Sequence, residues 1–261
     1  MSTWDYKICP SFVFMKIVSI IPARYDSQRF PAKLMQSLGG KSVILRTYEN
    51  ALATGLFDEV FVATDSLLIF DEISDNGGKA VMTKSTHQCG SDRIAEAVEE
   101  MDADIVINVQ GDEPFIDKKS LSNLIQVFHN DSHKEISLAS LMTPIKNSEE
   151  IQNPSVVKVI VDLNNFALYF SRSVIPHNRD QEQQTLHYKH IGVYAFRKEA
   201  LMEFSKQEMT PMEAAEKVEC IRYLEHGKKI KMVATDVLNF GIDTPEDLQQ
   251  AKAFLNEIKS K

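Results

Sequence analysis

The amino-acid sequence predicts an α/β fold in which a mostly parallel sheet is covered by helices. Short runs rich in β-branched residues alternate with stretches of helical periodicity, and no internal repeat or proline-rich linker interrupts this alternation. The chain has 261 residues, 43% of them hydrophobic, which is enough for a sizeable core. We therefore expect one domain over residues 15–261.

Each predicted strand is a short apolar run, beginning with KIVSII, whose continuous apolar character is typical of a buried strand. In order, the predicted strands are residues 16–21, 59–65, 80–83, 104–112, 136–142, 156–162, 190–196 and 229–235. The predicted helices have apolar residues at helical spacing. They are residues 43–55, 91–101, 119–130 and 212–227. Residues 160–190 depart from the alternation, and we expect them to form an inserted arm or an interface element.

The composition argues against several classes of protein. The net charge of −8 is unlike that of nucleic-acid-binding proteins, which carry a basic surplus. The three cysteines, an odd number without CxxC spacing, favour a reducing compartment over a disulfide framework or a structural zinc site. No apolar run approaches the length of a membrane span. We expect a cytoplasmic protein that binds neither nucleic acid nor membrane.

Residues 1–14 lack the charged region and apolar core of a secretion signal. Because Met15 begins a good strand, we expect residues 1–14 to be a flexible N-terminal extension. The sequence leaves open whether this extension belongs to the native protein.

The fingerprints of two common phosphate-binding loops are absent. GGKS at residues 39–42 resembles the end of a P-loop, but Met35 stands where the first glycine would be, and no GxGxxG occurs. His129 and His133 have a spacing that can bind zinc, but they lie at a predicted helix end, where a cation caps the helix.

A cationic loop, PARYDSQRFPAK, follows the first predicted strand. It contains Arg24, Arg29 and Lys33 between Pro22 and Pro31, with a single carboxylate inside it. An isolated cation usually marks a solvated turn, but three in a loop held by two prolines favour an anion-binding site. A triphosphate suits this loop.

The stretch INVQGDEP brings Gln110, Asp112 and Glu113 to the end of another predicted strand, with Gly111 allowing close backbone approach. GDEP is also good turn chemistry. However, adjacent carboxylates at a strand end beside a cationic loop are typical of a magnesium site, since Mg²⁺ takes one or two carboxylates plus phosphate oxygens.

The stretch GIDTPEDL has the pattern of a helix start, with Thr244 as N-cap, Pro245 at the first position and Asp247 at the third. This explains three residues without invoking function. Asp243 precedes the cap, and the residue pattern leaves it open as a turn carboxylate or a ligand. Together the three stretches predict Mg²⁺-dependent nucleotidyl transfer, a reaction driven by charge and positioning.

Seven motifs in this order resemble those of the 3-deoxy-manno-octulosonate cytidylyltransferase (CMP-Kdo synthetase) family. They are IIPARYDSQRFPAK, VATD, CGSDRIAEA, INVQGDEP, ALYFSRSVIP, HIGVYAFR and GIDTPEDL. The resemblance covers nearly the whole chain from Met15 onward. It implies a Rossmann-like nucleotide-diphospho-sugar transferase fold, usually homodimeric. The implied reaction couples CTP and Kdo to give CMP-Kdo and pyrophosphate, for lipopolysaccharide synthesis.

The resemblance also implies roles for individual residues. The nucleotide site would comprise Pro22, Ala23, Arg24, Arg29, Lys33, Ser91, Arg93 and Gln110. Asp112 and Asp243 match the Mg²⁺ ligands, and with Arg24 and Lys33 they form the implied catalytic set. The sugar site would comprise Arg172, His190, Tyr194 and Glu219, with Arg172 on the Kdo carboxylate. From the residues alone, Tyr194 is equally a strand aromatic and His190 a satisfied core histidine.

Four positions depart from the family's usual pattern. Ala32 stands for a glycine, Cys89 for a residue that is commonly serine, and Ser66 for an acid or another polar residue after VATD. Cys220 follows Glu219 where the family has glutamine, and a thiol cannot replace an amide's hydrogen bonds. The sequence therefore leaves two alternatives open: the same chemistry on a modified ulosonic acid such as 8-amino-Kdo, or a non-catalytic paralogue that binds nucleotide or sugar. It also does not decide the number of catalytic metals.

Overall fold

The computed structural model describes residues 14–26, 30–87, 89–180, 185–236 and 241–259. Of the predicted N-terminal extension, only Phe14 lies in these ranges, and its side chain is exposed. No helix among the described residues is both long and apolar enough to cross a membrane.

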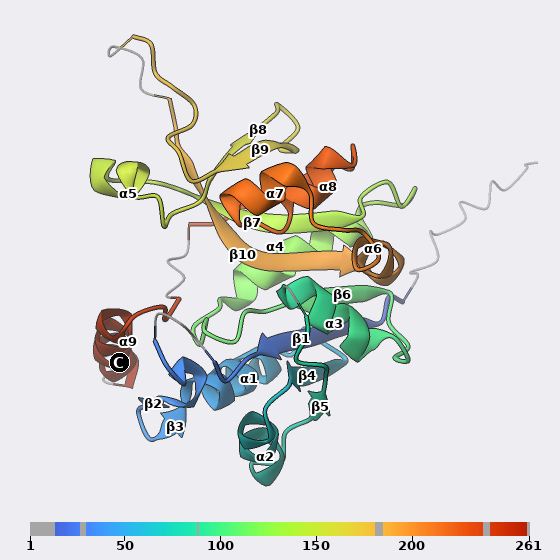
Figure 1. The fold of residues 1–261 in the computed structure, drawn as a ribbon, viewed down its shortest axis with the longest axis vertical. Helices are drawn as coiled ribbons and strands as arrows, with labels where there is room; N and C mark the ends of the chain where they lie inside the picture. The colour runs from blue at the N-terminus through green and yellow to red at the C-terminus, as the bar shows by residue number, and fades with distance from the viewer. Residues whose placement is uncertain (1–13, 27–29, 88, 181–184, 237–240, 260–261) are drawn as a thin grey trace, which may run out of the picture.

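One mixed sheet organises the fold, in the order β11-β7-β10-β6-β1-β4-β5, with β8 and β9 joined to it through β10 (Figure 1). Along that order β10 alone runs against its neighbours, so the sheet is mostly parallel, as predicted. The strands are β1 (Ile17–Ala23), β4 (Glu59–Thr64), β5 (Ala80–Met82), β6 (Ile105–Asn108), β7 (Leu138–Pro144), β8 (Lys158–Val161), β9 (Ala167–Ser171), β10 (Tyr188–Arg197) and β11 (Ile230–Ala234); a separate pair is β2 (Ser37–Leu38) and β3 (Lys41–Ser42).

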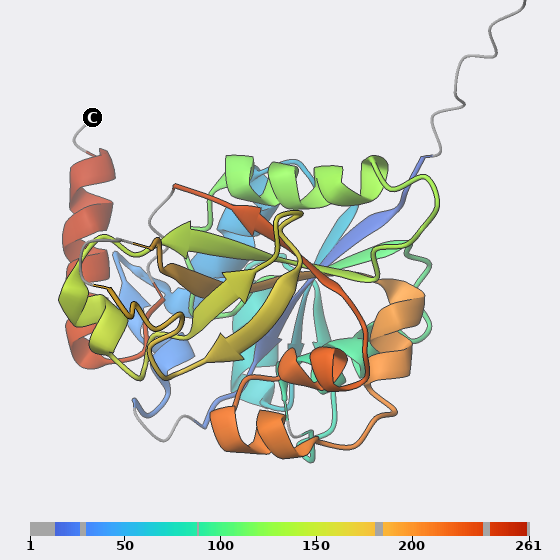
Figure 2. The same cartoon turned by 90° about the horizontal axis from the view of Figure 1, so that it is seen from above.

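Helices cover both faces of the sheet, as Figures 1 and 2 show. Buried side chains of α1, α2, α4 and α9 share a core on one face, and those of α3, α6 and α8 share a core on the other. The helices are α1 (Val43–Ala53), α2 (Leu67–Asp75), α3 (Gly90–Val98), α4 (Lys118–His129), α5 (Ser148–Gln152), α6 (Lys198–Phe204), α7 (Pro211–Glu216), α8 (Ile221–Glu225) and α9 (Pro245–Lys259), with a short 3₁₀ helix, η1 (Lys33–Met35).

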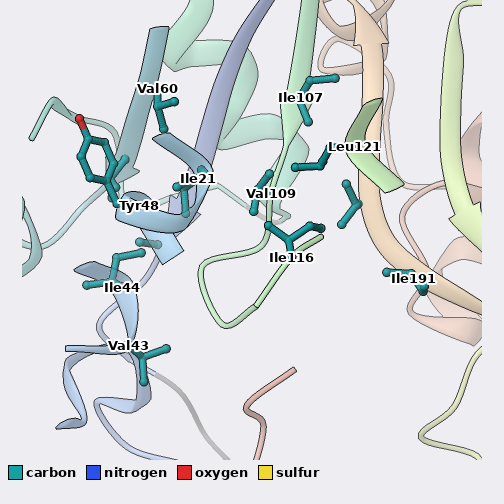
Figure 3. Close-up of a cluster of buried hydrophobic side chains, with 14 of the residues drawn as sticks. Ile21, Val43, Ile44, Tyr48, Val60, Ile107, Val109, Ile116, Leu121 and Ile191 are labelled. Atoms are coloured by element: carbon teal, nitrogen blue, oxygen red, sulfur yellow. The ribbon is translucent and has the colours of Figure 1, made fainter. Parts of the chain in front are cut away.

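The central strand β1 belongs to both cores because its side chains alternate between the two faces. Ile17 and Ile21 pack in the core with α1 and α4, and Val18 and Ile20 pack in the opposite core. Figure 3 shows part of the first core, where Ile21 lies among apolar side chains from α1 and from the β6 region. The apolar run recognised in the sequence is therefore buried on both faces.

The chain changes direction across the sheet beside β1. From β1 it proceeds through β4 to β5 on one side, and then crosses to β6 on the other side of β1. In open α/β sheets ligands bind beyond the carboxyl ends of strands at such a point. This predicts a site where β1 and β6 end, at the cationic loop and the GDEP turn.

Most predicted elements are found within one to three residues of their predicted bounds, and two differ more. The predicted helix over residues 212–227 is wrong as one element: it is α7 and α8, separated where Lys217 adopts a left-handed conformation with φ of 53°. The predicted strand over residues 104–112 ends at Asn108, so Gln110 and Asp112 lie in a turn. The segment over residues 160–190, which departs from the alternation, contains β9 and the end of β8, and these two strands pair as an antiparallel hairpin.

Candidate active site

The loop after β1 begins with Pro22 and Ala23, the last residues of the strand, and continues with the exposed Arg24. The Arg24 guanidinium donates a hydrogen bond to the carbonyl of His87, which lies before α3. This joins the cationic loop to the segment leading into α3. Arg29 lies outside the described residues, so its predicted role stays a prediction.

Lys33 lies at the centre of the candidate site. Its ammonium contacts a carboxylate oxygen of Asp112, and it lies 2.9 Å from Oδ1 of Asp243. Burial alone would lower the pKa of Lys33, but the charges and hydrogen bonds of the two aspartates outweigh burial and raise it above its usual value. The three residues predicted from separate stretches of sequence therefore meet at one point.

Asp243 reaches this point because the segment before α9 pairs with the GDEP turn. The Ile242 amide donates to the Asp112 carbonyl at 2.9 Å, which sets the next residue, Asp243, beside Asp112. The helix start predicted from Thr244 and Asp247 is confirmed: the Asp247 amide donates to Thr244 Oγ1 at 3.2 Å, and the Thr244 amide donates to Asp247 Oδ2 at 2.9 Å. Asp247 also accepts from the Asp243 amide at 3.0 Å, so the cap orients the candidate ligand.

Gly111 lets the GDEP turn pack closely against the end of β1. A Cβ at Gly111 would lie 3.0 Å from the Pro22 carbonyl oxygen, tighter than most real contacts. The Thr47 hydroxyl on α1 donates to the Gly111 carbonyl at 2.9 Å. Gln110 is held from the other side, with its amide donating to the Gly192 carbonyl at 3.2 Å.

The residues present fit a divalent cation. Carboxylate oxygens of Asp112 and Asp243 converge on one cationic nitrogen, so they point at a common position. Two carboxylates, with phosphate oxygens completing the shell, suit Mg²⁺ as a hard oxygen-preferring ion.

Two adjoining cavities open beside this cluster. The smaller, of about 220 Å³, is lined by Pro22, Ala23, Arg24, Asp26, Lys33, Leu34, Gly90, Arg93, Gln110, Gly111 and Asp112. The larger, of about 840 Å³, includes Gln110, Glu113, His190, Tyr194, Glu219 and Asp243 in its lining. Gly90 and Gln110 line both, so the cavities meet there. Asp112 and Lys33 line the smaller cavity and Asp243 the larger, which puts the charged cluster at the junction.

Arg93 of α3 is fully buried beneath the smaller cavity. Its guanidinium donates to Asp65 at 2.9 Å and to the Thr83 hydroxyl at 2.5 Å. Asp65, the last residue of the VATD motif, follows β4 and acts as the counter-ion of Arg93. The predicted nucleotide residue Arg93 lies with the others, and its planar guanidinium is held at the wall of the cavity.

Ser91 also belongs to α3, but its side chain contacts Glu219, a residue in the lining of the larger cavity. Its hydroxyl donates to Glu219 at 3.1 Å, and the Cys89 thiol is hydrogen-bonded to the same carboxylate. Burial raises the pKa of Glu219 although these hydrogen bonds oppose the shift. Ser91 was predicted to contact nucleotide; in the structure it holds a predicted sugar residue.

His190 and Tyr194 come from β10, and their rings pack against each other at a tilt in the wall of the larger cavity. Their ring centroids are 5.5 Å apart, and Phe170 packs edge-on against His190 at 4.8 Å. Burial lowers the pKa of His190 to about 3, so its imidazole is neutral at physiological pH. The Tyr194 hydroxyl is hydrogen-bonded to the buried Cys220 thiol, which is how the structure accommodates that departure from the family pattern.

Arg172 is not among the residues that line the larger cavity. Its guanidinium donates to backbone carbonyls, that of Glu216 at 2.6 Å and that of Pro154 at 3.0 Å. Arg172 therefore binds the backbone at the end of α7, three residues before Glu219. The structure therefore does not bring Arg172 together with the other predicted sugar residues, and its binding of a carboxylate stays a prediction.

Glu113 and Lys189 line the larger cavity and were not among the predicted sugar residues. Oε2 of Glu113 is buried and has no hydrogen-bond partner among the described residues. Burial and the nearby charge of Asp112 raise the pKa of Glu113 to about 8, although Lys189 acts in the opposite direction. Lys189 precedes His190 and lies 3.0 Å from Glu150. The GDEP motif pointed to Glu113 as a metal carboxylate, but only the fold shows it in the larger cavity.

Comparison with known proteins agrees with this geometry. Residues 18–230 match the family model of cytidylyltransferases. A 3-deoxy-manno-octulosonate cytidylyltransferase of Christiangramia forsetii is 61% identical to this chain over 92% of the chain and 97% of the relative. The chain belongs to this family.

Further 3-deoxy-manno-octulosonate cytidylyltransferases support the assignment. The one from Flavobacterium johnsoniae is 60% identical, over 94% of this chain and all of its own length. The structure of a CMP:2-keto-3-deoxy-manno-octonic acid synthetase complexed with CTP has a TM-score of 0.87, at 37% identity, covering 93% of this chain and 99% of that one. The predicted family and fold are thus confirmed.

Proposed function

We propose that this protein transfers CMP from CTP to Kdo, giving CMP-Kdo and pyrophosphate. The observation that supports this most directly is the meeting of Lys33, Asp112 and Asp243 at the junction of two cavities. Transfer requires a nucleotide and an acceptor to meet at the reacting phosphate, and the charged cluster lies where two such ligands would meet. The names of the relatives and the CTP complex of a related structure supply the identities of the ligands.

On the nucleotide side, positively charged residues balance the phosphates. Arg24 and Lys33 line the smaller cavity. We propose the same phosphate-binding role for Arg29, which lies outside the described residues. Their charges stabilise negative charge that develops on the leaving pyrophosphate, a contribution that needs no covalent step. Arg93 is paired with Asp65 and so forms a fixed part of the wall rather than a free phosphate ligand.

Asp112 and Asp243 would hold the metal, which we propose is Mg²⁺. When bound, the ion lowers the pKa of the attacking sugar hydroxyl and neutralises phosphate charge. The chain's own contribution is to fix the two carboxylates: Asp112 through the Ile242 pairing and Asp243 through Asp247 of the cap. Lys33 adds a third charge at the same point.

On the sugar side, we assign hydroxyl contacts to His190, Tyr194 and Glu219, all in the lining of the larger cavity. We retain Arg172 as the proposed partner of the sugar carboxylate. We further propose a homodimer, supported by exposed leucines on and around the β8–β9 hairpin.

The deciding measurement is pyrophosphate release from the purified protein with Mg²⁺ and CTP, with and without Kdo, beside ATP, GTP and UTP. We expect release only with CTP and Kdo together. Asp112→Asn should reduce it by at least about a hundredfold. Asp75→Asn, at the exposed end of α2, is the matched control and should leave it unchanged.

Other outcomes decide against parts of the proposal. Release with 8-amino-Kdo but not Kdo would replace the sugar while keeping the chemistry. If CTP raises the melting temperature but no ulosonic acid triggers release, the protein is a binding paralogue, and the proposal of transfer is wrong.

A further inference from the structure

The hydroxyl of Ser140, a fully buried residue of β7, meets three polar groups of β10. Its Oγ lies 2.8 Å from the Val193 carbonyl oxygen, 3.2 Å from that of Ile191, and 3.0 Å from Nε2 of His190. The two carbonyls reach it because the β7–β10 register is interrupted between Ile191 and Tyr194. Such an irregularity takes the carbonyls of Ile191 and Val193 out of the regular hydrogen-bond ladder between the strands, and the Ser140 hydroxyl takes the place of their backbone partners.

The positions of the protons follow from what each group can do. Carbonyl oxygens only accept, and a serine hydroxyl has one hydrogen. That hydrogen must point to the carbonyls of Val193 and Ile191, because two oxygens 2.8 Å apart attract only with a proton between them. The hydroxyl oxygen then offers His190 only a lone pair, so His190 Nε2 carries the ring proton.

The other ring nitrogen is therefore an acceptor. His190 lines the larger cavity, and its Nδ1 has no hydrogen-bond partner among the described residues. Burial keeps the ring neutral, with the pKa lowered to about 3. Phe170 and Tyr194 pack against the ring and hold its orientation.

We propose that Ser140 is a positioning residue that fixes His190 in the Nε2–H tautomer, so that Nδ1 accepts a hydrogen bond from a hydroxyl of the bound sugar. This rests on the proposed function. Within the described part of the chain, no other group is hydrogen-bonded to the His190 ring. The tautomer decides which substituents of the sugar are bound. A donor substituent on the sugar, a hydroxyl or amine, is bound at Nδ1, whereas an acceptor-only substituent meets a lone pair and is rejected.

The tautomer is read directly by two-dimensional ¹H–¹⁵N NMR of protein labelled at histidine nitrogens, with His190→Gln to assign the signal. In the wild-type protein we expect a protonated Nε2 and an unprotonated Nδ1, unchanged from neutral to mildly acidic pH. Adding Kdo should shift the Nδ1 resonance. A proton on Nδ1 in the wild-type protein would overturn the proposal, and this result does not depend on any variant folding.

Variants test whether Ser140 sets the tautomer. Ser140→Ala should give a mixture of tautomers and raise KM for Kdo about tenfold, with KM for CTP unchanged. Ser140→Thr, which keeps the hydroxyl, should restore the single tautomer. Ser19→Ala is the matched control, since Ser19 is an equally buried serine on β1 whose hydroxyl has no partner in the described structure.

Two results would contradict the proposal separately from the proposed function. If Ser140→Ala leaves both the tautomer and KM for Kdo unchanged, Ser140 is not a positioning residue. The wild-type protein could instead show the expected tautomer, make no product from Kdo and show no shift of Nδ1 when Kdo is added. In that case the proposed function fails, and the contact between Nδ1 and the sugar fails with it. The assignment of Ser140 as the residue that sets the tautomer would still stand.

Discussion

At the scale of single residues, the loop that carries Lys33 begins with an unfavourable backbone conformation. Ala32, where the family has glycine, adopts φ of 52° and ψ of 31°, in the left-handed region. A residue with a Cβ costs roughly 1–2 kcal/mol there. The resemblance stated in the sequence analysis implies a glycine at this position, and the left-handed backbone is the conformation that favours one.

Relief of this strain is partly offset, because glycine gains about 0.4–1 kcal/mol of entropy in the unfolded chain. We therefore predict that Ala32→Gly raises the free energy of unfolding by about 0.5 kcal/mol. The midpoint of urea unfolding measures this. Ala53→Gly is the control. Ala53 is an exposed residue in the last turn of α1, where glycine relieves no strain, so this substitution should lower the free energy of unfolding by roughly 0.5–1 kcal/mol. Destabilisation by both substitutions would show that Ala32 is not strained.

At the scale of elements, the start of α9 connects helix capping to the active site. Asp247 accepts from the amides of both Thr244 and Asp243. Thr244 in turn accepts from the Asp247 amide. Loss of the threonine hydroxyl removes a hydrogen bond that holds the first turn of α9. The Asp247 side chain, which binds the Asp243 amide, is then less firmly held, and so is Asp243.

We predict that Thr244→Ala lowers the free energy of unfolding by about 1 kcal/mol and raises the Mg²⁺ concentration for half-maximal activity severalfold. Thr244→Ser keeps the hydroxyl and should match the wild-type protein in both measurements. A Thr244→Ala protein that loses stability but keeps its Mg²⁺ dependence would show that the cap does not orient Asp243.

Most strands of the large sheet and the helices α1, α3 and α4 were predicted from the sequence, whereas α2 and α6 were missed and interruptions were not predicted. The apolar spacing of residues 212–227 is helical throughout, and nothing local signals the break at Lys217. The break depends on contacts outside the segment, such as those of Arg172 with the carbonyls of Glu216 and Lys217. Long-range contacts of this kind override local propensity.

At the scale of the whole molecule, the candidate site follows from topology more than from any motif. Lys33 and Asp112 are 79 residues apart, and Lys33 and Asp243 are 210 apart. The cationic loop and the carboxylates of the GDEP turn, each at a strand end, predicted a shared site for Lys33 and Asp112. The approach of Asp243 depends on one backbone hydrogen bond between Ile242 and Asp112, which no local pattern reveals. The family resemblance, not residue spacing, identified Asp243 as a metal ligand.

The arrangement of exposed leucines leads to the last prediction, on assembly. Leu168 of β9 and Leu186, just before β10, are 59% and 63% exposed, and Leu163 in the hairpin turn is fully exposed. The hairpin lies at the top of Figure 1, at the opposite end of the molecule from α2. Exposed apolar side chains gathered on one segment are typical of a protein interface.

We predict that the wild-type protein is a dimer in light scattering coupled to size-exclusion chromatography, and that the double variant Leu168→Glu, Leu186→Glu is a monomer, because an interface cannot bury two unpaired carboxylates. Leu67→Glu, Leu68→Glu is the matched control: these leucines of α2 are 67% and 58% exposed and lie at the other end of the molecule. The control should remain dimeric. A monomeric wild-type protein, or a dimer that only the control disrupts, would remove the hairpin from the proposed interface.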